Sequence, residues 1–246
     1  MIGDTMATSG VTAVERALSV VESFRGGADR LALQTIADRT GLNKATIIRL
    51  IASLEKFGYV LRVGPGEYAL GPAFLEYGTL YQASFQISDH ALPIMRELVE
   101  MSGESAGLFV RDGEMRICLH KVGSAAALLS SLREGDRRPI LPGGTGKVML
   151  AFSDDQQERK GWGEIRRDHY IVNIGDRHPD FSSLAAPIFA AGQKLTAVMS
   201  LSGPTSNFTD RRISENLPRL LAAARDLTRR VGGDASVFET RLSEIG

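Results

Sequence analysis

Apolar residues recur at helical spacing within residues 33–59, whose sequence is LQTIADRTGLNKATIIRLIASLEKFGY. In the second half of this stretch they lie three or four positions apart, which places them on one face of a helix. These residues are Ile47, Leu50, Ile51 and Leu54. The pattern predicts an amphipathic helix that packs on a neighbouring helix through its apolar face.

A tight turn precedes this helix. Gly41 can adopt the positive φ that a turn between two helices needs, and Ala37 leaves room for the two helices to cross closely. Asn43 follows the turn and is a favourable N-cap. The stretch therefore predicts a helix-turn-helix, whose second helix is the one that enters a DNA groove.

The outward face of the second helix carries small residues around one arginine, which suits close approach to base edges. Arg49 can pair with guanine in the major groove, and Ala or Thr can contact a thymine methyl group. Lys44, Thr46 and the helix N-terminus suit phosphates. The candidate DNA-binding residues are Asn43, Lys44, Ala45, Thr46, Arg49, Ser53, Lys56 and Arg62. The alternative is an ordinary surface helix with two basic residues.

The flanking segments extend the motif. Thr12 and Glu15 form a possible capping box in front of an apolar stripe, which predicts a helix before the motif. After the motif, residues 59–63 and 67–70 predict two short strands around Gly-Pro-Gly. A hairpin in this position makes a winged helix, and Arg62 is then placed to reach the DNA backbone. The alternative is a hairpin that only closes the small core.

Charge is balanced over the whole chain, with 29 Lys or Arg and 29 Asp or Glu. Between residues 39 and 62, however, five residues are basic (39, 44, 49, 56 and 62) and one is acidic (55). A neutral chain argues against nonspecific coating of nucleic acid. The local excess fits a dimer that binds selected sites through a few contacts per subunit.

The length allows two unequal domains. We expect a disordered arm at 1–11, the winged helix at 12–71, a linker helix at 72–92 and a second domain at 93–246. Aromatic and apolar residues recur along the linker at roughly helical spacing. They suit a dimer contact, or equally packing against the same chain.

The second domain mixes helices with strands. Pro93 can open a helix to about Met101, and Asp112-Gly113 predicts a hairpin. Helices are expected at about 93–101, 147–152 and 211–231, and strands at about 105–111, 114–122, 126–133, 170–174, 182–189 and 194–202. Helices before and after a mainly antiparallel sheet make an α+β domain.

One strand of this sheet also suggests a binding site. Side chains alternate along 195–202, so one face is apolar and the other offers hydroxyl groups, including Ser200 and Ser202. Ser183 on the neighbouring strand is placed to line the same cavity. The segment Gly143-Gly144-Thr145-Gly146 precedes a helix, and its N–H groups suit a carboxylate. The alternative is that the glycines only permit close packing and the serines face solvent.

The whole chain resembles the IclR type of transcriptional regulator, almost from end to end. The matching segments are 37–42, 46–54, 68–71, 146–151, 185–188 and 200–204. The resemblance implies a winged helix, a linker helix and a GAF-like effector domain. It also implies dimers, often paired as tetramers, that control catabolic genes in response to small organic acids.

The resemblance also implies which residues contact the effector. They are Gly144, Thr145, Asn173, Ser183, Ser200 and Ser202. The chain departs from the family pattern at Asn173 and Ser183, where an acidic residue and, in some members, cysteine occur. The segment between Phe152 and His169 is also short for the family, which predicts a more open pocket.

Other classes of function fit less well. The glycine segment lacks the spacing of a phosphate-binding loop, and the single cysteine excludes an intrachain disulfide. An enzyme using Cys118 and His120 as a pair on one strand face remains an alternative, as does a ligand-independent DNA-binding dimer with a vestigial pocket. No metal or cofactor is expected. The chain shows neither a membrane span nor a signal peptide, so we expect a cytoplasmic protein.

Overall fold

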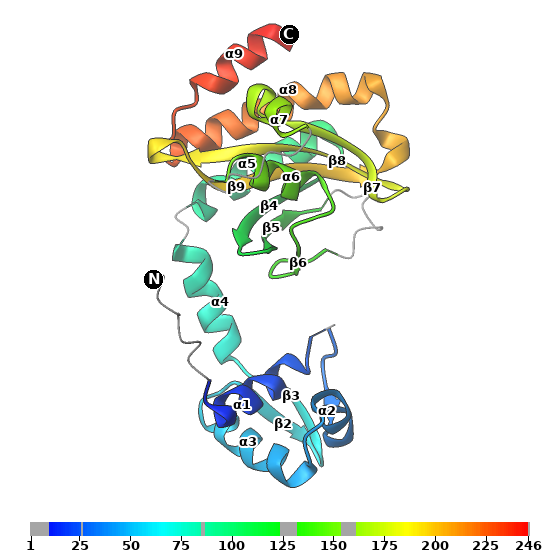
Figure 1. Ribbon diagram of the computed structural model, residues 1–246, viewed down its shortest axis with the longest axis vertical. Helices are drawn as coiled ribbons and strands as arrows, with labels where there is room; N and C mark the ends of the chain where they lie inside the picture. Colours follow the sequence, from blue (N-terminus) through cyan, green and yellow to red (C-terminus); the bar gives the residue numbers. More distant parts are fainter. Residues whose placement is uncertain (1–9, 26, 85–86, 124–131, 154–160, 246) are drawn as a thin grey trace, which may run out of the picture. The chain divides into compact units, whose positions relative to one another are not determined.

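The computed structural model describes residues 10–25, 27–84, 87–123, 132–153 and 161–245 (Figure 1). The chain divides into two compact units, residues 1–81 and 82–246, and each is described by itself. Of the expected segments, most of the N-terminal arm and most of the strand at 126–133 lie outside the described residues. Within the described ranges, no helix is long and apolar enough to cross a membrane.

The N-terminal unit is a winged helix-turn-helix, as predicted. Its elements are α1 (Thr12–Glu22), β1 (Leu31–Ala32), α2 (Leu33–Thr40), α3 (Lys44–Lys56), β2 (Val60–Gly64) and β3 (Glu67–Leu70). The three strands form one antiparallel sheet in the order β1-β3-β2. Ile36 of α2 and Ile47 and Ile51 of α3 are fully buried in the core, which also contains Tyr68 from the wing.

The turn between α2 and α3 forms as its sequence predicts. Gly41 ends α2 with a φ of 69°, a left-handed conformation that glycine adopts without a steric penalty. The side chain of Asn43 then accepts a hydrogen bond of 2.8 Å from the backbone N–H of Thr46. The cap expected at α1 is different, because Thr12 is already the first helical residue. Val11 is the N-cap residue, and no side chain caps this helix.

The linker helix α4 (Ala73–Ser84) is shorter than expected. Its first turns pack on its own chain, where Tyr59 makes an edge contact with Phe74 and stacks on Tyr77. On the same helix, Leu75 and Leu80 remain 76% and 60% exposed. The helix thus combines the two expected uses of its apolar residues: some pack locally, and others are not covered by the residues that the structure describes.

The C-terminal unit contains a six-stranded sheet in which every neighbouring pair is antiparallel. The strand order is β6-β5-β4-β9-β8-β7. The strands are β4 (Ser105–Asp112), β5 (Met115–Val122), β6 (Arg137–Pro139), β7 (Ile171–His178), β8 (Phe181–Ala190) and β9 (Lys194–Pro204). The helices are α5 (Ser88–Ser102), α6 (Gly144–Ala151), α7 (Trp162–Asp168), α8 (Asp210–Arg230) and α9 (Ser236–Ile245).

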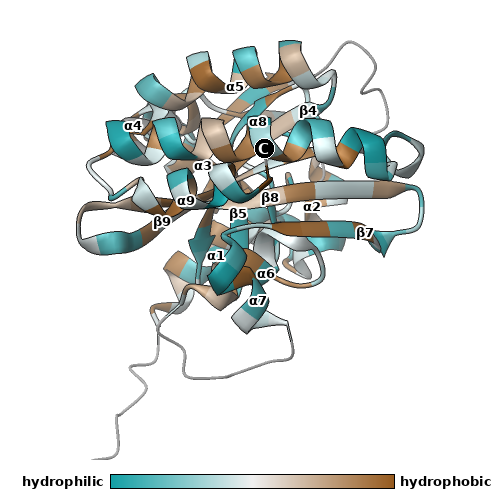
Figure 2. Ribbon diagram, turned by 90° about the horizontal axis from the view of Figure 1, so that it is seen from above, coloured by the Kyte–Doolittle hydropathy of each residue, from teal (hydrophilic) through white to brown (hydrophobic). Residues whose placement is uncertain are grey.

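Helices cover both faces of this sheet, because its strands carry apolar side chains on both faces. Helices α5, α8 and α9 pack on one face through a core that includes Leu108, Met199 and Leu201. Helices α6 and α7 pack on the other face with Phe109, Cys118 and other residues. Hydrophilic and hydrophobic residues are mixed along α5 and α8, as expected for helices with one covered side (Figure 2). The expected α+β architecture is confirmed.

Several boundaries differ from the sequence prediction. Helix α5 begins at Ser88, so Pro93 lies inside the helix and does not open it. Helix α6 begins at Gly144 and not at Lys147, which places Gly144 and Thr145 in its first turn. Strand β6 and helix α9 were not expected. Strand β7 continues to His178, past an irregularity in its pairing with β8.

Candidate functional site

The predicted DNA-binding residues lie on the outer side of the N-terminal unit. Helix α3 supplies six of them, Asn43 caps that helix, and Arg62 lies on β2. Seven of the eight are exposed and Thr46 is half-buried. Ile48 is 43% exposed and adds an apolar side chain next to Arg49 in the sequence of α3.

Arg62 has partners within its own unit. Its guanidinium lies 4.0 Å from a carboxylate oxygen of Glu55 and 5.6 Å from the ring centre of Tyr68. Exposed pairs of this kind are weak, so the side chain can exchange Glu55 for a phosphate. Arg62 therefore remains a candidate for contact with the DNA backbone.

The second site is a cavity of about 520 Å³ on the face of the sheet that α6 covers, called here the α6 pocket. All six residues predicted from the sequence line it. The complete lining consists of Phe109, Arg116, Leu132, Asp136, Arg138, Gly143, Gly144, Thr145, Asn173, Arg177, His178, Asp180, Phe181, Ser183, Ser200 and Ser202. The pocket therefore joins the start of α6 to residues of all six strands of the sheet.

Strand pairing brings the predicted polar residues together. Ser183 of β8 is the register partner of both Asn173 on β7 and Ser202 on β9. Gly144 lies against the same group, since a Cβ atom at this position would be 3.3 Å from the Ser183 hydroxyl oxygen. The alternation along β9 is confirmed, because Met199 and Leu201 enter the core under α5 and α8 while Ser200 and Ser202 line the pocket.

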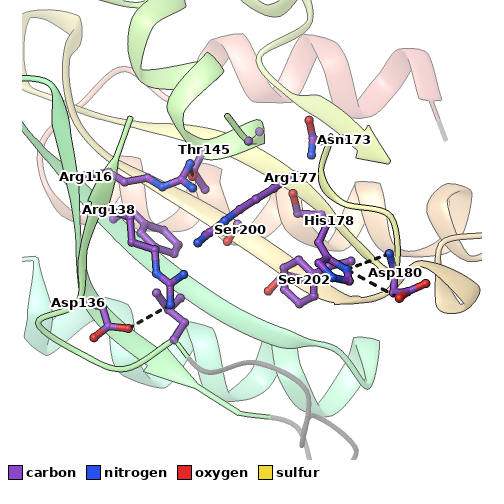
Figure 3. A pocket seen from close by; sticks show the side chains of 16 residues that line it. Arg116, Asp136, Arg138, Thr145, Asn173, Arg177, His178, Asp180, Ser200 and Ser202 are labelled. Atoms are coloured by element: carbon purple, nitrogen blue, oxygen red, sulfur yellow. Dashed lines mark hydrogen bonds and ion pairs between the residues drawn. The ribbon is translucent and has the colours of Figure 1, made fainter. Parts of the chain in front are cut away.

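Arg116 of β5 was not predicted, although it dominates the inner wall of the pocket (Figure 3). The residue is only 5% exposed. Its guanidinium donates to the Thr145 hydroxyl at 2.8 Å and to the carbonyl oxygens of Ile140 at 3.3 Å and Pro142 at 3.2 Å. These bonds hold the charged group in one position beside the first turn of α6.

Two more arginines line the pocket, Arg138 on β6 and Arg177 on β7. Burial, together with the neighbouring charges of Arg177 and Arg138, lowers the pKa of Arg116 to about 10. Burial and Arg138 likewise lower the pKa of Arg177. Arginine still stays protonated at neutral pH, so the pocket concentrates positive charge.

The first turn of α6 adds backbone donors to this positive region. No side chain caps the helix, and its N-cap Gly143 has a φ of 123°. The N–H of Gly143 donates to the Asp176 carboxylate at 3.1 Å, and Asp176 also pairs with Lys147 at 2.9 Å. The chain thus already places one carboxylate at the start of this helix, as expected from the helix dipole.

Two family models match the chain. The IclR helix-turn-helix domain matches residues 13–64, and the bacterial transcriptional regulator IclR C-terminal domain matches residues 79–164 and 159–229. The chain belongs to the IclR family of transcriptional regulators. The family assignment agrees with the winged helix-turn-helix of the N-terminal unit.

Individual IclR relatives match over nearly the whole chain. The transcriptional repressor IclR of Escherichia coli is 27% identical over 253 residues, covering 92% of each protein. KipR of Bacillus subtilis is 26% identical over 225 residues, covering 82% of this chain and 90% of KipR. A solved IclR homologue from Microbacterium hydrocarbonoxydans has the same fold, with a TM-score of 0.76 at 18% identity, covering 89% of this chain and all of that one.

The enzyme alternative for this IclR-family chain required Cys118 and His120 to share a strand face. A bulge in the pairing of β5 with β4 interrupts that alternation. The Cys118 thiol contacts the backbone carbonyl of His120 at 3.5 Å, whereas the His120 ring bonds Ser88 at 2.8 Å. Burial raises the pKa of Cys118 to about 12, so the thiolate needed for nucleophilic attack is disfavoured. The prediction that Cys118 and His120 share a strand face is wrong, because the bulge lies between them.

Proposed function

We propose that this regulator binds an operator through α3 and the wing, and that a small organic acid in the α6 pocket changes its operator affinity. The observation that carries the second half is the convergence of six sequence-predicted residues, five of them polar, and a buried arginine on one cavity. The related structure from Microbacterium hydrocarbonoxydans is complexed with 4-hydroxybenzoate, which is a carboxylate.

The DNA contacts divide into two groups by chemistry. Arg49, with Ala45 and Ile48 beside it, suits base edges in the major groove. Lys44, Lys56 and Arg62 suit phosphates, which fix position without reading sequence. The exposed remainder of α4 supports a dimer, since Leu75 and Leu80 are apolar and uncovered. Two subunits would then place two α3 helices on a roughly palindromic site.

The acid changes operator affinity through thermodynamic linkage between the two binding sites. A ligand shifts operator affinity only as far as it prefers one arrangement of the subunits over another. The pocket supplies the parts for acid binding, namely a buried guanidinium, the uncapped start of α6 and hydroxyl groups on β8 and β9. The competing function is ligand-independent DNA binding with a vestigial pocket.

Fluorescence anisotropy with the DNA upstream of the gene tests both halves. The titration is run at several salt concentrations, then repeated with a panel of organic acids that includes 4-hydroxybenzoate. Arg49→Ala should weaken operator binding by about 1–3 kcal/mol if Arg49 reads a base. The matched control is Arg25→Ala, because Arg25 is an exposed arginine of the same unit that pairs with Glu22 away from α3.

The possible results separate the proposals. Site-specific binding that one acid alters, and that Arg49→Ala but not Arg25→Ala weakens, supports the complete function. Specific binding that no acid changes favours the vestigial pocket. Equal loss of affinity for operator and scrambled DNA in Arg49→Ala would remove the base-reading role of Arg49.

A further inference from the structure

The charges around the α6 pocket are not balanced within the chain. Asp136 lies 3.4 Å from Arg138 and also accepts from the backbone N–H of Arg133 at 3.0 Å. Asp180 faces His178 at 3.8 Å, and its side chain is 87% exposed. Each acidic residue of the lining therefore either has a cationic partner of its own or points largely into solvent.

Two guanidinium groups lack a counterion among the residues that the structure describes, because no carboxylate of that part pairs with Arg116 or Arg177. Arg116 donates only to a hydroxyl and to carbonyl oxygens, which are neutral. Burying a charge is unfavourable unless an opposite charge compensates it, and this applies to Arg116, because the residue is 5% exposed. Arg177 is exposed and adds a second positive charge to the lining of the same cavity.

The two arginines approach the pocket from different elements. Arg116 lies on β5 and is fixed beside Thr145 at the start of α6. Arg177 lies on the last part of β7, beyond Gly175, whose φ of 63° accompanies the break in pairing between Asn173 and His178. Figure 3 shows its side chain reaching from β7 into the pocket toward Ser200.

We propose that the ligand of the α6 pocket is an organic dianion, whose two negative charges neutralise Arg116 and Arg177. The inference rests on the proposed function of the pocket and specifies the charge of its ligand. A dicarboxylate and a phosphate monoester share this chemistry. The apolar side chains of Phe109, Leu132 and Phe181 cover the carbon skeleton, and the pocket serines bind its neutral polar groups.

The two arginines have different parts in this arrangement. Arg116 is the fixed anchor, because three acceptors already orient its guanidinium and a carboxylate gains a preorganised donor. Arg177 is exposed overall and has no such partners, so it provides the second charge and distinguishes a dianion from a monoanion. Removing Arg177 should therefore abolish the preference for a dianion over a monoanion, whereas removing Arg116 should abolish binding of both.

The test compares matched ligands on the full-length protein by isothermal titration calorimetry. The pairs are succinate and succinamate, phthalate and benzoate, and methyl phosphate and dimethyl phosphate, each titrated at one pH and salt concentration. We expect at least one dianion to bind about tenfold more tightly than its partner, since a hydrogen bond to a charged group contributes that much or more. Comparing the carboxylate pairs with the phosphate pair identifies the source of the charge.

Arg177→Gln should reduce this ratio to near one while leaving the affinity for the monoanion unchanged. Arg211→Gln is the control, because the Arg211 side chain is 88% exposed on α8 and lies outside the pocket lining. Arg177 is exposed, so the substitution should not disturb folding, and thermal unfolding checks this.

A monoanion that binds as tightly as its dianionic partner would overturn the inference, and so would a dianion preference that survives in Arg177→Gln. Failure of every compound to bind would overturn it too. The operator titration without ligand tests DNA binding separately. A monoanion that both binds and alters operator affinity would leave the proposed function in place and remove only the dianion.

Discussion

Two adjacent isoleucines on α3 provide a direct test of how this helix is oriented. Ile47 is fully buried and Ile48 is 43% exposed, although the residue type and the helix are the same. Substituting each in turn by alanine compares burial with exposure while holding the local sequence almost constant. The structure requires Ile47 for stability and leaves Ile48 available for DNA.

The magnitude follows from the atoms removed. Ile47→Ala deletes three buried carbons, each worth about 0.8 kcal/mol in transfer free energy, and leaves a cavity that the core fills incompletely. A loss of about 2.5–4 kcal/mol is therefore expected. A unit of 81 residues has a total stability of roughly 4–12 kcal/mol, so the substitution removes a large fraction of it. Ile48→Ala should change stability by less than about 0.5 kcal/mol.

Native-state hydrogen exchange, read by mass spectrometry on peptides from residues 31–70, measures this for the N-terminal unit alone. Global unfolding probes are unsuitable, because the single tryptophan, Trp162, lies in the other unit. Ile47→Ala should accelerate exchange throughout these peptides, and Ile48→Ala should not. Equal acceleration by both variants would refute the assigned orientation of α3. If Ile48→Ala leaves hydrogen exchange unchanged but weakens operator binding, Ile48 belongs to the DNA-binding surface.

Three further predictions concern single side chains. Asn43→Ala should destabilise the N-terminal unit by about 1 kcal/mol, because it removes the bond to the Thr46 N–H; the same exchange experiment detects the loss in the first turn of α3. Thr145→Val should weaken acid binding about tenfold or more, since it removes an acceptor that holds Arg116, and calorimetry checks this against an unchanged operator affinity. Cys118 has a pKa raised from 9.0 to about 12 by burial, so the folded state holds this proton more tightly than the unfolded state. Stability should fall as pH rises from 9.0 toward 12, and urea titrations should show a smaller fall in Cys118→Ala.

The sequence predicted the winged helix well because its determinants are local. A turn glycine, an N-cap and apolar spacing all act within a few residues of one another, as at Gly41 and Asn43. The serines of β8 and β9 were also predictable, since alternation along a strand assigns each side chain to a face. Ser200 and Ser202 needed no knowledge of distant segments beyond the existence of a core on the other side.

The arginines of the pocket depend on long-range contacts and were therefore missed. Arg138 lies on β6, a three-residue strand recognisable only through its pairing with β5. Arg177 follows Gly175, where the apolar pattern of β7 ends but its pairing later resumes at His178. Burial of Arg116 depends on carbonyl groups of residues 24 and 26 positions away. The hydrophobic periodicity of a single segment cannot predict these contacts between residues that are distant in the sequence.

The glycines before α6 have a consequence for how such a regulator can acquire a new effector. A Cβ atom at position 146 would lie 1.5 Å from the Ile140 carbonyl oxygen, one of the groups that hold Arg116. Close packing of this segment and the position of Arg116 therefore depend on the same carbonyl group. Ser200 and Ser202 line the same pocket through side chains on β9. The α6 pocket thus combines a helix start whose backbone leaves no room for substitution at Gly146 with strand side chains that can be exchanged. We therefore expect new specificities to arise from the strand residues, while Gly146 and Arg116 are retained.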